Sequence, residues 1–361
     1  MTADLVVIGG GPLGLATALY AGRAGLSVSV LEPRAGVVDK ACGEGLMPGA
    51  LTALQGLGVD PPGRVLAGIR YTDGQRWATA EFPRGPGRGV RRTTLHGCLL
   101  EAAGRAGVEV VTGAMEQIDQ DESGVSVRIA GRATALRGSY AVAADGLHSP
   151  TRRALGLQGP ARGRRRHGIR QHFRLTPWSG HVEVHWAERA EAYVTPVADD
   201  LVGVAVLTGT RGSLEDHLAA FPQLVDRLAG ATRASSPRGA GPLRQRVTSR
   251  AAGRVLLVGD AGGYVDALTG EGLAVGLAQA QVAVRALASG RPDRYPRWAH
   301  AVSWRGTALT AGLLAATGPT WARRRLLPAT AALPWLFHRA VDELAHPGPG
   351  VAPARPSVDR G

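Results

Sequence analysis

The stretch Leu5-Val6-Val7-Ile8-Gly9-Gly10-Gly11-Pro12-Leu13-Gly14, together with Glu32 further along, decides the fold of this chain. Its four leading apolar residues are typical of a parallel strand buried on both faces of a sheet. Residues 13–23 then have the composition of a helix packed on that sheet, and residues 27–31 that of a second strand. The pattern predicts a strand–turn–helix–strand unit at the start of an α/β fold.

The glycines of this turn have the G-x-G-x-x-G spacing of dinucleotide-binding folds. Gly9 permits the tight turn, Gly11 lets the backbone approach a pyrophosphate at the helix N-terminus, and Gly14 permits close packing of the helix on the strand. Glu32 stands where a carboxylate binds an unphosphorylated ribose, so FAD or NAD fits better than NADP. The predicted nucleotide-binding residues of this unit are Gly9, Gly11, Pro12, Gly14, Glu32 and Arg34.

The composition is that of a globular protein with a strongly basic balance. In 361 residues, 42 basic residues stand against 29 acidic ones for a formal charge of +13, and Lys40 is the only lysine. This charge would attract anionic partners, so a non-catalytic nucleic-acid or membrane-surface binder is a remote alternative. However, the arginines are spread along the chain and aromatic residues make up only 5% of it. We expect no nucleic-acid partner and at most peripheral contact with a membrane.

The cysteine count and the N-terminus exclude other classes. Cys42 and Cys98 form neither a disulfide framework nor a metal-ligand cluster, and we expect no metal. The N-terminus carries Asp4 and no basic region, which argues against a signal peptide. The apolar segments 309–316 and 326–337 are each shorter than the roughly twenty residues that span a bilayer. The protein is therefore predicted to be cytoplasmic.

The rest of the pattern predicts a second sheet that interrupts the first domain. A hairpin at residues 69–77, with an Asp73-Gly74 turn, does not belong to a parallel sheet. Further strands of this antiparallel sheet are predicted at residues 168–175, 182–186, 192–195 and 201–207. We expect a Rossmann-like domain with a parallel sheet (1–63, 90–160 and 245–290), an interleaved antiparallel-sheet substrate domain (64–89 and 161–244), C-terminal helices (291–346) and a disordered tail (347–361).

Periodicity and cap residues place the remaining elements. Helices are predicted at residues 51–57, 91–105, 213–228 and 273–287. Strands are predicted at residues 108–111, 125–129, 133–137, 140–144 and 255–258, with 125–129 and 133–137 as a meander.

Three blocks in order carry a resemblance to a known family. The first is the Gly9–Gly14 turn with Glu32, the second is Asp145-Gly146-Leu147-His148-Ser149 with Arg152, and the third runs from Gly259 to Gly272. With these blocks the sequence resembles the FAD-dependent oxidoreductases built like p-hydroxybenzoate hydroxylase, and within them the geranylgeranyl reductase family. The resemblance covers residues 1–290 and implies that the Rossmann-like domain binds FAD.

The resemblance also assigns residues to FAD. Arg92 would contact it near the pyrophosphate and the ribityl chain, and Asp260 would bond the ribityl hydroxyls. The helix after Thr269 would direct its N-terminus at the flavin edge that becomes negative on reduction. The cofactor residues implied by the resemblance are Arg92, Asp145, Gly259, Asp260, Gly270, Gly272 and Leu273. Because no second glycine-rich motif is present, NAD(P)H would be a transient electron donor.

The loop after Glu32 supplies the candidate catalytic residues Cys42, Glu44 and Lys40. In reductase-like relatives a Cys-Gly loop lies beside the isoalloxazine, so Cys42 would shape the substrate pocket, donate a proton or be a packed thiol. Glu44 lies between two glycines and has little packing to justify its presence. Lys40 has a compact ammonium with a tunable pKa.

A basic cluster comprises Arg162, Arg164, Arg165, Arg166 and Arg170. The ordinary interpretation is a solvated face, and the alternative is that it steers a carrier-protein- or CoA-linked substrate. On the same strand, Arg170 and His172 either contact the small-molecule substrate or are solvated, and the solvated interpretation is favoured.

Two flavin-dependent reactions fit these residues. The favoured one is monooxygenation of an aromatic or polyketide-like small molecule in secondary metabolism, with NAD(P)H and O2. The alternative is reduction or dehydrogenation of an isoprenoid or other carbon–carbon double bond. The Cys42 loop favours the reductase, whereas the short length and the lack of a lipid-sized apolar signature favour the monooxygenase. The Trp-x-Trp-x-Ile-Pro signature of flavin-dependent halogenases is absent from the sequence.

Overall fold

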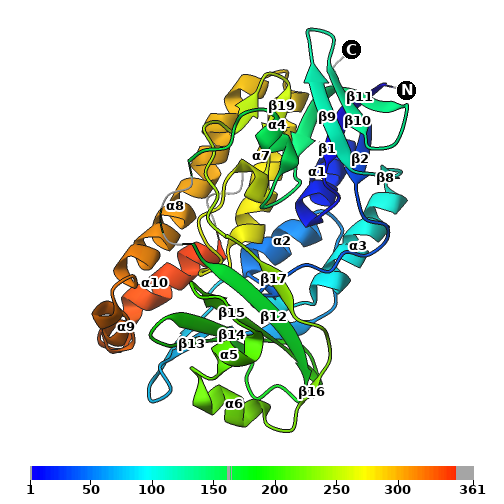
Figure 1. Cartoon of the computed structure of the whole chain (residues 1–361). Coiled ribbons are helices and arrows are strands. Elements are labelled where there is room, and N and C mark those ends of the chain that lie inside the picture. The colour runs from blue at the N-terminus through cyan, green and yellow to red at the C-terminus, as the bar shows by residue number, and fades with distance from the viewer. Residues whose placement is uncertain (1, 161–162, 164, 347–361) are drawn as a thin grey trace.

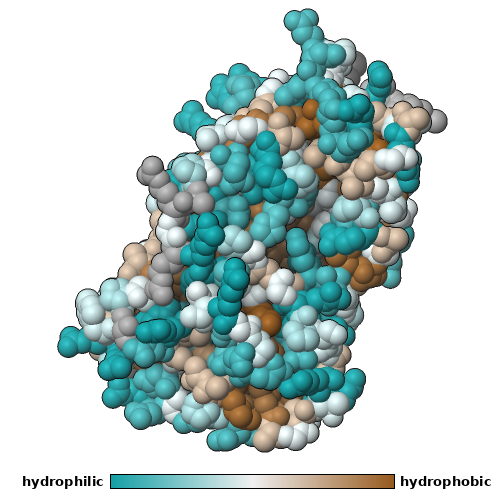
Figure 2. All heavy atoms as spheres, viewed as in Figure 1, coloured by the Kyte–Doolittle hydropathy of each residue, from teal (hydrophilic) through white to brown (hydrophobic). Residues whose placement is uncertain are grey.

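The computed structural model describes residues 2–160, 163 and 165–346, which form two large sheets with helices packed around them (Figure 1). The fold is α/β, with mixed parallel and antiparallel sheets and C-terminal helices, as predicted. The tail predicted for residues 347–361 lies outside the described residues. The face in view is mostly hydrophilic, with small hydrophobic patches (Figure 2).

The first sheet has a parallel centre. Strand β1 pairs in parallel with β11 and β2, β2 with β8, and β11 with β19. The order is β18 (Ala251–Ala252), β19 (Val255–Leu257), β11 (Ala135–Ala143), β1 (Thr2–Ile8), β2 (Val28–Glu32) and β8 (Glu109–Thr112), and the antiparallel strands β10 (Val125–Ile129) and β9 (Met115–Gln120) extend from β11.

Both faces of this sheet are covered, which explains the charge-free run at its centre. Val7 packs in a cluster with residues of α1 (Pro12–Arg23) and α7 (Gly272–Ala288), and its neighbour Val6 packs on the other face against β10. Helix α3 (Arg92–Arg105) packs against α1, and α2 (Pro48–Gly56) packs against α7. The short helices α4 (Pro150–Ala154) and η1 (Gly259–Gly262) follow β11 and β19.

The second sheet is antiparallel except where β5 pairs with β13. Its order is β16 (Thr232–Arg233), β12 (His167–Arg174), β15 (Leu201–Thr208), β14 (Ala190–Ala198), β13 (His181–Trp186), β5 (Gly68–Thr72) and β6 (Trp77–Glu81), with β17 (Arg238–Ala240) also beside β12. Helices α5 (Leu214–Leu218) and α6 (Pro222–Leu228) pack on one face of it. A third, small sheet has the order β3 (Gly45–Leu46), β7 (Gly87–Gly89) and β4 (Arg64–Leu66), and its strands β7 and β4 pack against β14.

The C-terminal helices run along one side of both sheets (Figure 1). They are η2 (Pro292–Arg294), α8 (Tyr295–Ala316), α9 (Thr320–Ala332) and α10 (Pro334–Ala345). Phe337 and Val341 of α10 pack against Tyr71 and Val184 of the second sheet. None of the helices described is both long and apolar enough to cross a membrane.

Several predicted boundaries are wrong, and proline accounts for two of them. The helix predicted at residues 213–228 is split into α5 and α6 because Phe221 precedes Pro222 and leaves the helical region. The segment 326–337 is likewise split at Leu333, before Pro334. The strands predicted at 133–137 and 140–144 are one strand, β11, because β1 pairs along both halves of it. Strand β9 was not predicted because its residues are mostly polar.

Candidate functional site

A cavity of about 860 Å³ is lined by residues of both sheets. Gly9, Gly11 and Glu32 line it at the carboxyl ends of β1 and β2, and Tyr71 and Val341 line its opposite end. Most of the predicted site residues share this one cavity. Those that line it are Gly9, Gly11, Pro12, Glu32, Arg34, Lys40, Cys42, Glu44, Arg92, Asp145, Arg170, Asp260, Gly270, Gly272 and Leu273.

Three predicted residues, Gly14, Gly259 and His172, lie behind the cavity wall. Gly259 has φ +63°, and a Cβ there would lie 2.2 Å from Leu13 Cδ1. A Cβ on Gly14 would lie 1.7 Å from the carbonyl oxygen of Gly9, so α1 can pack this closely on the glycine turn only with glycine at this position. His172 contacts the loop that carries Glu44. These residues support the lining residues rather than facing the cavity.

The glycine turn leaves open space at its tip. Gly9 adopts φ +103° and packs against the end of β11, where a Cβ would lie 2.7 Å from the carbonyl oxygen of Ala144. A Cβ on Gly11, by contrast, would meet nothing within 4 Å. The free space at Gly11 lies at the N-terminus of α1, where a phosphate group is stabilised by backbone N–H groups.

Glu32 is held at the edge of the turn. Its Oε2 accepts a hydrogen bond of 2.8 Å from Gly10 N, and its Oε1 accepts one of 2.7 Å from Arg34 Nε. His96, which the sequence analysis missed, is buried on α3 with Nε2 2.8 Å from the Gly10 carbonyl oxygen and Nδ1 3.2 Å from Val38 N. Burial lowers the pKa of His96, so the neutral ring donates through Nε2 and accepts through Nδ1. Its only sequence signal was its place beside the apolar face of α3.

Arg152 joins the second and third sequence blocks. Its buried guanidinium donates hydrogen bonds of 3.1 Å to the carbonyl oxygens of both Asp260 and Ala261. In the second block, Asp145 accepts a hydrogen bond of 3.0 Å from Thr151 N through Oδ2. Its Oδ1 is buried and has no hydrogen-bond partner in the protein. One carboxylate oxygen of Asp145 therefore remains available to a ligand.

Two cations and one carboxylate face the middle of the cavity. Burial raises the pKa of Asp260, although Lys40, Arg92 and Arg152 act against this rise. Burial also lowers the pKa of Lys40, and the charge of Asp260 opposes that change. Arg92 Nε is buried without a hydrogen-bond partner. Such a group of donors and one acceptor suits a ligand that carries both phosphates and hydroxyls.

Glu44 has the most constrained environment in the loop. It is 3% exposed and is the one residue other than glycine with a positive φ, +61°, in the described part of the chain. Its Oε1 accepts a hydrogen bond of 2.9 Å from Arg92 N, and its Oε2 lies 2.7 Å from His172 Nε2. A left-handed backbone and a buried carboxylate both cost free energy, so the surrounding contacts must hold Glu44 in place.

The solvated interpretation of Arg170 and His172 is wrong, because both side chains are buried beneath this loop. Arg170 donates hydrogen bonds of 2.5 Å to Asp39 Oδ1 and 3.1 Å to the Lys40 carbonyl oxygen, and its Nη1 lies 3.1 Å from His172 Nδ1. Burial opposes ionisation of Asp39, but the Arg170 hydrogen bond and nearby positive charges hold its pKa below the ordinary value. His172 thus contacts Glu44 through Nε2, and its Nδ1 lies near both Arg170 and the Ser235 hydroxyl, which is 2.9 Å away.

Cys42 lies two residues before Glu44 and faces the cavity as a free, half-buried thiol. Its Sγ accepts a hydrogen bond of 3.4 Å from Glu44 N. Because the sulfur acts as acceptor in that contact, its own S–H remains free to point into the cavity. The loop is fixed from the other side by Thr195, whose Oγ1 donates a 2.8 Å hydrogen bond to the Gly43 carbonyl oxygen.

The end of the cavity beyond this loop is apolar. Its walls come from β5, β13, β14 and α10, and the Tyr193 hydroxyl there donates to the Leu268 carbonyl oxygen at 2.7 Å. Apolar side chains on this part of the wall are Leu66, Ile69, Phe82, Val182, Val184, Leu268, Val341 and Leu344.

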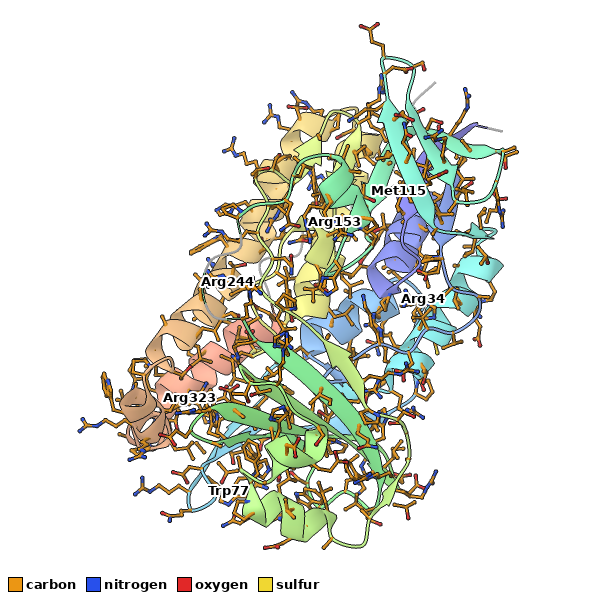
Figure 3. The ribbon with its side chains drawn as sticks, viewed as in Figure 1. Arg34, Trp77, Met115, Arg153, Arg244 and Arg323 are labelled. Atoms are coloured by element: carbon orange, nitrogen blue, oxygen red, sulfur yellow. The ribbon has the colours of Figure 1, made fainter. Side chains whose placement is uncertain are left out.

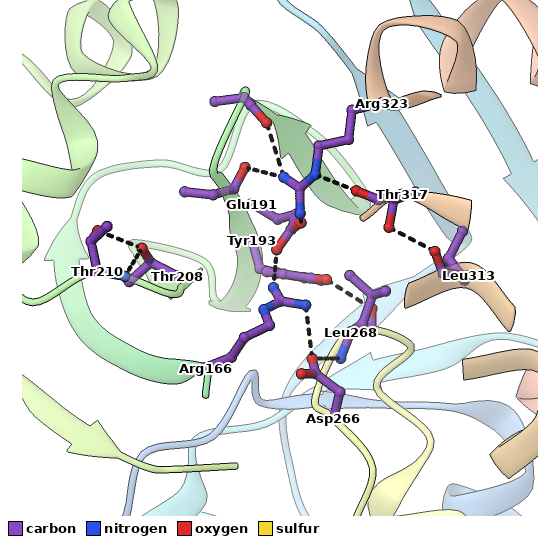
Figure 4. Close-up of polar contacts among 12 residues, drawn as sticks. Arg166, Glu191, Tyr193, Thr208, Thr210, Asp266, Leu268, Leu313, Thr317 and Arg323 are labelled. Atoms are coloured by element: carbon purple, nitrogen blue, oxygen red, sulfur yellow. Dashed lines mark hydrogen bonds and ion pairs between the residues drawn. The ribbon is translucent and has the colours of Figure 1, made fainter. Parts of the chain in front are cut away.

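The basic cluster is not a single solvated face. Arg166 is buried and forms ion pairs with Glu191 and, at 3.2 Å, with Asp266, while Arg323 pairs with the same Glu191 (Figure 4). Arg323 lies where the C-terminal helices meet the antiparallel sheet (Figure 3). Arg170 is also internal, and Arg162 and Arg164 lie outside the described residues. Sequence spacing alone could not reveal these acidic partners, because they come from distant segments.

A family model described as an FAD binding domain matches residues 2–292. The chain belongs to this FAD-binding family. Its broad class is therefore FAD-dependent oxidoreductase, and the glycine turn, the open space at Gly11 and the unpaired polar atoms of Asp145 and Arg92 fit FAD.

Proteins similar to this FAD-binding chain include both reductases and hydroxylases. Menaquinone reductase of Mycobacterium tuberculosis strain H37Rv is 28% identical over 321 residues, covering 80% of this chain and 77% of that protein. Digeranylgeranylglycerophospholipid reductase 1 of Methanothermobacter thermautotrophicus is 28% identical over 315 residues, covering 80% and 78%. A 3-(3-hydroxy-phenyl)propionate/3-hydroxycinnamic acid hydroxylase of Mycobacterium sp. strain JLS is 34% identical over 170 residues, covering 43% and 29%.

Solved structures share the fold of this FAD-binding chain. The flavin-dependent brominase Bmp2 superposes with a TM-score of 0.80 at 17% identity, covering 96% of this chain and 94% of that one. The anhydrotetracycline hydroxylase OxyS of Streptomyces rimosus superposes with a TM-score of 0.75 at 22% identity, covering 96% and 76%. At such low identity the likeness extends to the fold alone.

Proposed function

We propose that this chain is an FAD-dependent reductase that saturates a carbon–carbon double bond of an apolar, isoprenoid-type substrate. The observation that carries the proposal is the Cys42–Glu44 loop, which places a thiol and a buried carboxylate between the dinucleotide site and an apolar chamber. The two reductases named above are similar to this chain over 80% of its length, whereas the hydroxylase is similar over 43%.

In this proposal FAD extends along the cavity from the glycine turn. Gly9 and Gly11 would approach the pyrophosphate, and Glu32 would bind the adenosine ribose. Arg92 and Lys40 would lie beside the phosphates and the ribityl chain, and Asp260 would accept bonds from ribityl hydroxyls. The N-terminus of α7, at Gly272, would stabilise negative charge on the reduced flavin. When bound and reduced, FAD supplies the hydride, and NAD(P)H is the proposed source of its electrons.

The protein must supply the proton that accompanies a hydride to a double bond. Cys42 is the proposed source, because its S–H is free to face the cavity while its sulfur accepts from Glu44 N. Glu44, His172 and Arg170 are proposed as positioning residues that hold the loop by buried hydrogen bonds. Lys40 is assigned to the cofactor rather than to proton transfer, because its Nζ packs closely against Gly146 of the second sequence block. A Cβ on Gly146 would lie only 2.8 Å from this Nζ.

The apolar chamber suits an isoprenoid chain. Hydrocarbon walls of aliphatic and aromatic side chains bind such a chain by removing its surface from water. Apolar walls would also keep water away from the reacting carbon atoms, which protects a reduced cofactor from wasteful reactions. The buried Tyr71 and the partly buried Tyr193 line the chamber without presenting charge, since burial raises the pKa of both hydroxyls.

Product analysis tests the proposal. FAD-loaded protein would be incubated with NADPH and geranylgeraniol or a menaquinone, once without oxygen and once in air. We expect a product with two additional hydrogen atoms in both incubations, and we expect Cys42→Ala to lower its rate by about tenfold or more. A product that forms only in air and carries one additional oxygen atom would overturn the reductase proposal.

Monooxygenation remains the second candidate, because the hydroxylase similarity over 170 residues has the higher identity. In that case the substrate would be an aromatic or polyketide-like molecule in the same chamber. Substrate-dependent oxygen uptake coupled to hydroxylated product would establish it. A carrier-protein- or CoA-linked substrate is a weaker proposal now that Arg166 and Arg170 are internal.

A further inference from the structure

The helices at the C-terminal end expose an unusual set of large apolar side chains. Residues 295–345 contain half of the ten large hydrophobic residues that are exposed in the described part of the chain. Trp321 at 68% and Trp335 at 63% are the two most exposed of the ten. Tryptophan is seldom left this accessible without a function, because its ring has a large apolar area to bury.

Arginines accompany these side chains. On α9, Arg324 and Arg325 follow Trp321 at the helical spacing that places them on its face, and both are exposed. On α10, Arg339 stands one turn after Trp335 and is also exposed. Residues 320–341 contain four arginines and no acidic residue. We define the C-terminal patch as Trp321, Arg324, Arg325, Leu333, Trp335, Leu336 and Arg339.

We propose that the C-terminal patch docks this protein on the surface of an anionic phospholipid membrane. Tryptophan rings fit the boundary between headgroups and acyl chains, and arginines beside them bind anionic headgroups. The charge complementarity favours a bilayer over a second copy of this chain, because an isologous dimer through the patch would oppose its arginines. Glu188 pairs with Arg324 only at 3.9 Å and both side chains are exposed, so this acid competes little with a lipid headgroup for the arginine.

Helix α10 connects this patch to the cavity. Its exposed side carries Trp335, Leu336 and Arg339, and its buried side carries Val341 and Leu344, which line the apolar chamber. Helices α8, α9 and α10 lie together along one side of the molecule in Figure 1. A membrane-bound isoprenoid would therefore meet the protein at the helix that closes the chamber. The docking proposal is independent of the proposed reaction, and vesicle binding tests it without any catalytic turnover.

The test is co-sedimentation of FAD-loaded protein with vesicles of phosphatidylcholine alone or with about one-third phosphatidylglycerol. We expect binding only to the anionic vesicles, and weaker binding at high salt. Replacing Arg324, Arg325 and Arg339 by glutamine should reduce the partition coefficient by about fivefold per arginine. Trp321→Ala with Trp335→Ala should reduce it by about tenfold or more.

A matched control separates docking from general charge. Arg105 of α3, Arg128 of β10 and Arg137 of β11 are exposed and belong to the first sheet or to the helices on it, away from the patch, so replacing all three by glutamine removes the same charge. This control should retain most of the binding. Retained bound FAD would show that each variant is folded. The proposal is overturned if no vesicle binds the protein, if the control loses as much binding as the patch variants, or if the patch variants alter only self-association.

Discussion

His172 Nε2 lies 2.7 Å from Glu44 Oε2 although 128 residues separate them in the sequence, and neither side chain is exposed. This contact joins the antiparallel sheet to the loop that follows the dinucleotide unit. Arg170, on the same strand, extends the contact to Asp39 at the start of the loop. The position of Cys42 in the cavity thus depends on a strand that belongs to the other sheet.

Breaking this pair should destabilise the protein. We expect His172→Ala to lower the free energy of unfolding by about 3 kcal/mol, because it leaves the Glu44 carboxylate buried with one partner fewer. Urea unfolding measures the change. Glu44→Gln should retain FAD and lower turnover, and the double variant should lose less stability than the sum of the two single variants. Strict additivity would show that the two side chains are not coupled.

Alanine substitutions at Gly14 and Gly11 should affect different properties, the first folding and the second FAD binding. Gly14→Ala should destabilise the fold by several kcal/mol or prevent folding, because the new methyl group would overlap the Gly9 carbonyl oxygen. Gly11→Ala should melt like the wild-type apoprotein, since its methyl group would enter open space and its φ of −67° suits alanine. It should nevertheless retain less FAD, because that space is where a pyrophosphate would bind. Full flavin occupancy in Gly11→Ala would show that the pyrophosphate does not bind at this position.

Adjacent arginines on α9 provide a matched pair. Arg323 is buried, pairs with Glu191 and donates a 2.7 Å hydrogen bond to the Thr317 carbonyl oxygen, whereas the Arg324 side chain is 77% exposed. Arg323→Leu should cost about 3 kcal/mol of unfolding free energy and raise hydrogen exchange in α9 and α10. Arg324→Leu should change stability by less than about 1 kcal/mol. Equal effects of the two substitutions would contradict the assigned role of the buried network.

Local sequence patterns were sufficient where the determining contacts are short-range. The first strand–turn–helix–strand unit, the Asp73-Gly74 hairpin and the helix start at residue 213 are all present as predicted. Strands β12, β13, β14 and β15 of the second sheet were also recovered, because each alternates or is bounded by turn residues. The Cys42 loop could be expected near the cofactor because it follows directly on Glu32.

Contacts between distant segments could not be predicted in the same way. Alternation placed Arg170 and His172 on one face of a strand, but nothing local showed that a loop covers that face. In the sequence, Arg166 is one member of a basic cluster that is ordinarily solvated. In the structure it is paired with Glu191 and Asp266. Ion pairs of this kind depend on tertiary packing, which single-residue polarity does not report.

Glu271 offers a test of buried charge through pH. It is 8% exposed at the start of α7, its Oε1 accepts a 2.8 Å hydrogen bond from Thr310, and its Oε2 has no hydrogen-bond partner. Burial raises its pKa above the ordinary value of 4.5, despite opposing hydrogen bonds from Thr310 and Thr269. Between the ordinary and the raised pKa the folded state holds a proton that the unfolded state has released, so stability falls as pH rises through this window.

Glu271→Gln should remove this pH-dependent loss of stability, because glutamine resembles the protonated acid at every pH. We expect the variant and the wild type to have similar melting temperatures near pH 4, and the variant to be the more stable above the window. Thr310→Val should increase the loss in the wild-type background, since the ionised carboxylate would lose its hydrogen bond. Melting curves recorded from acidic to neutral pH measure these differences. An offset between Glu271→Gln and the wild type that is the same at every pH would show that Glu271 does not titrate within the folded protein as its burial implies.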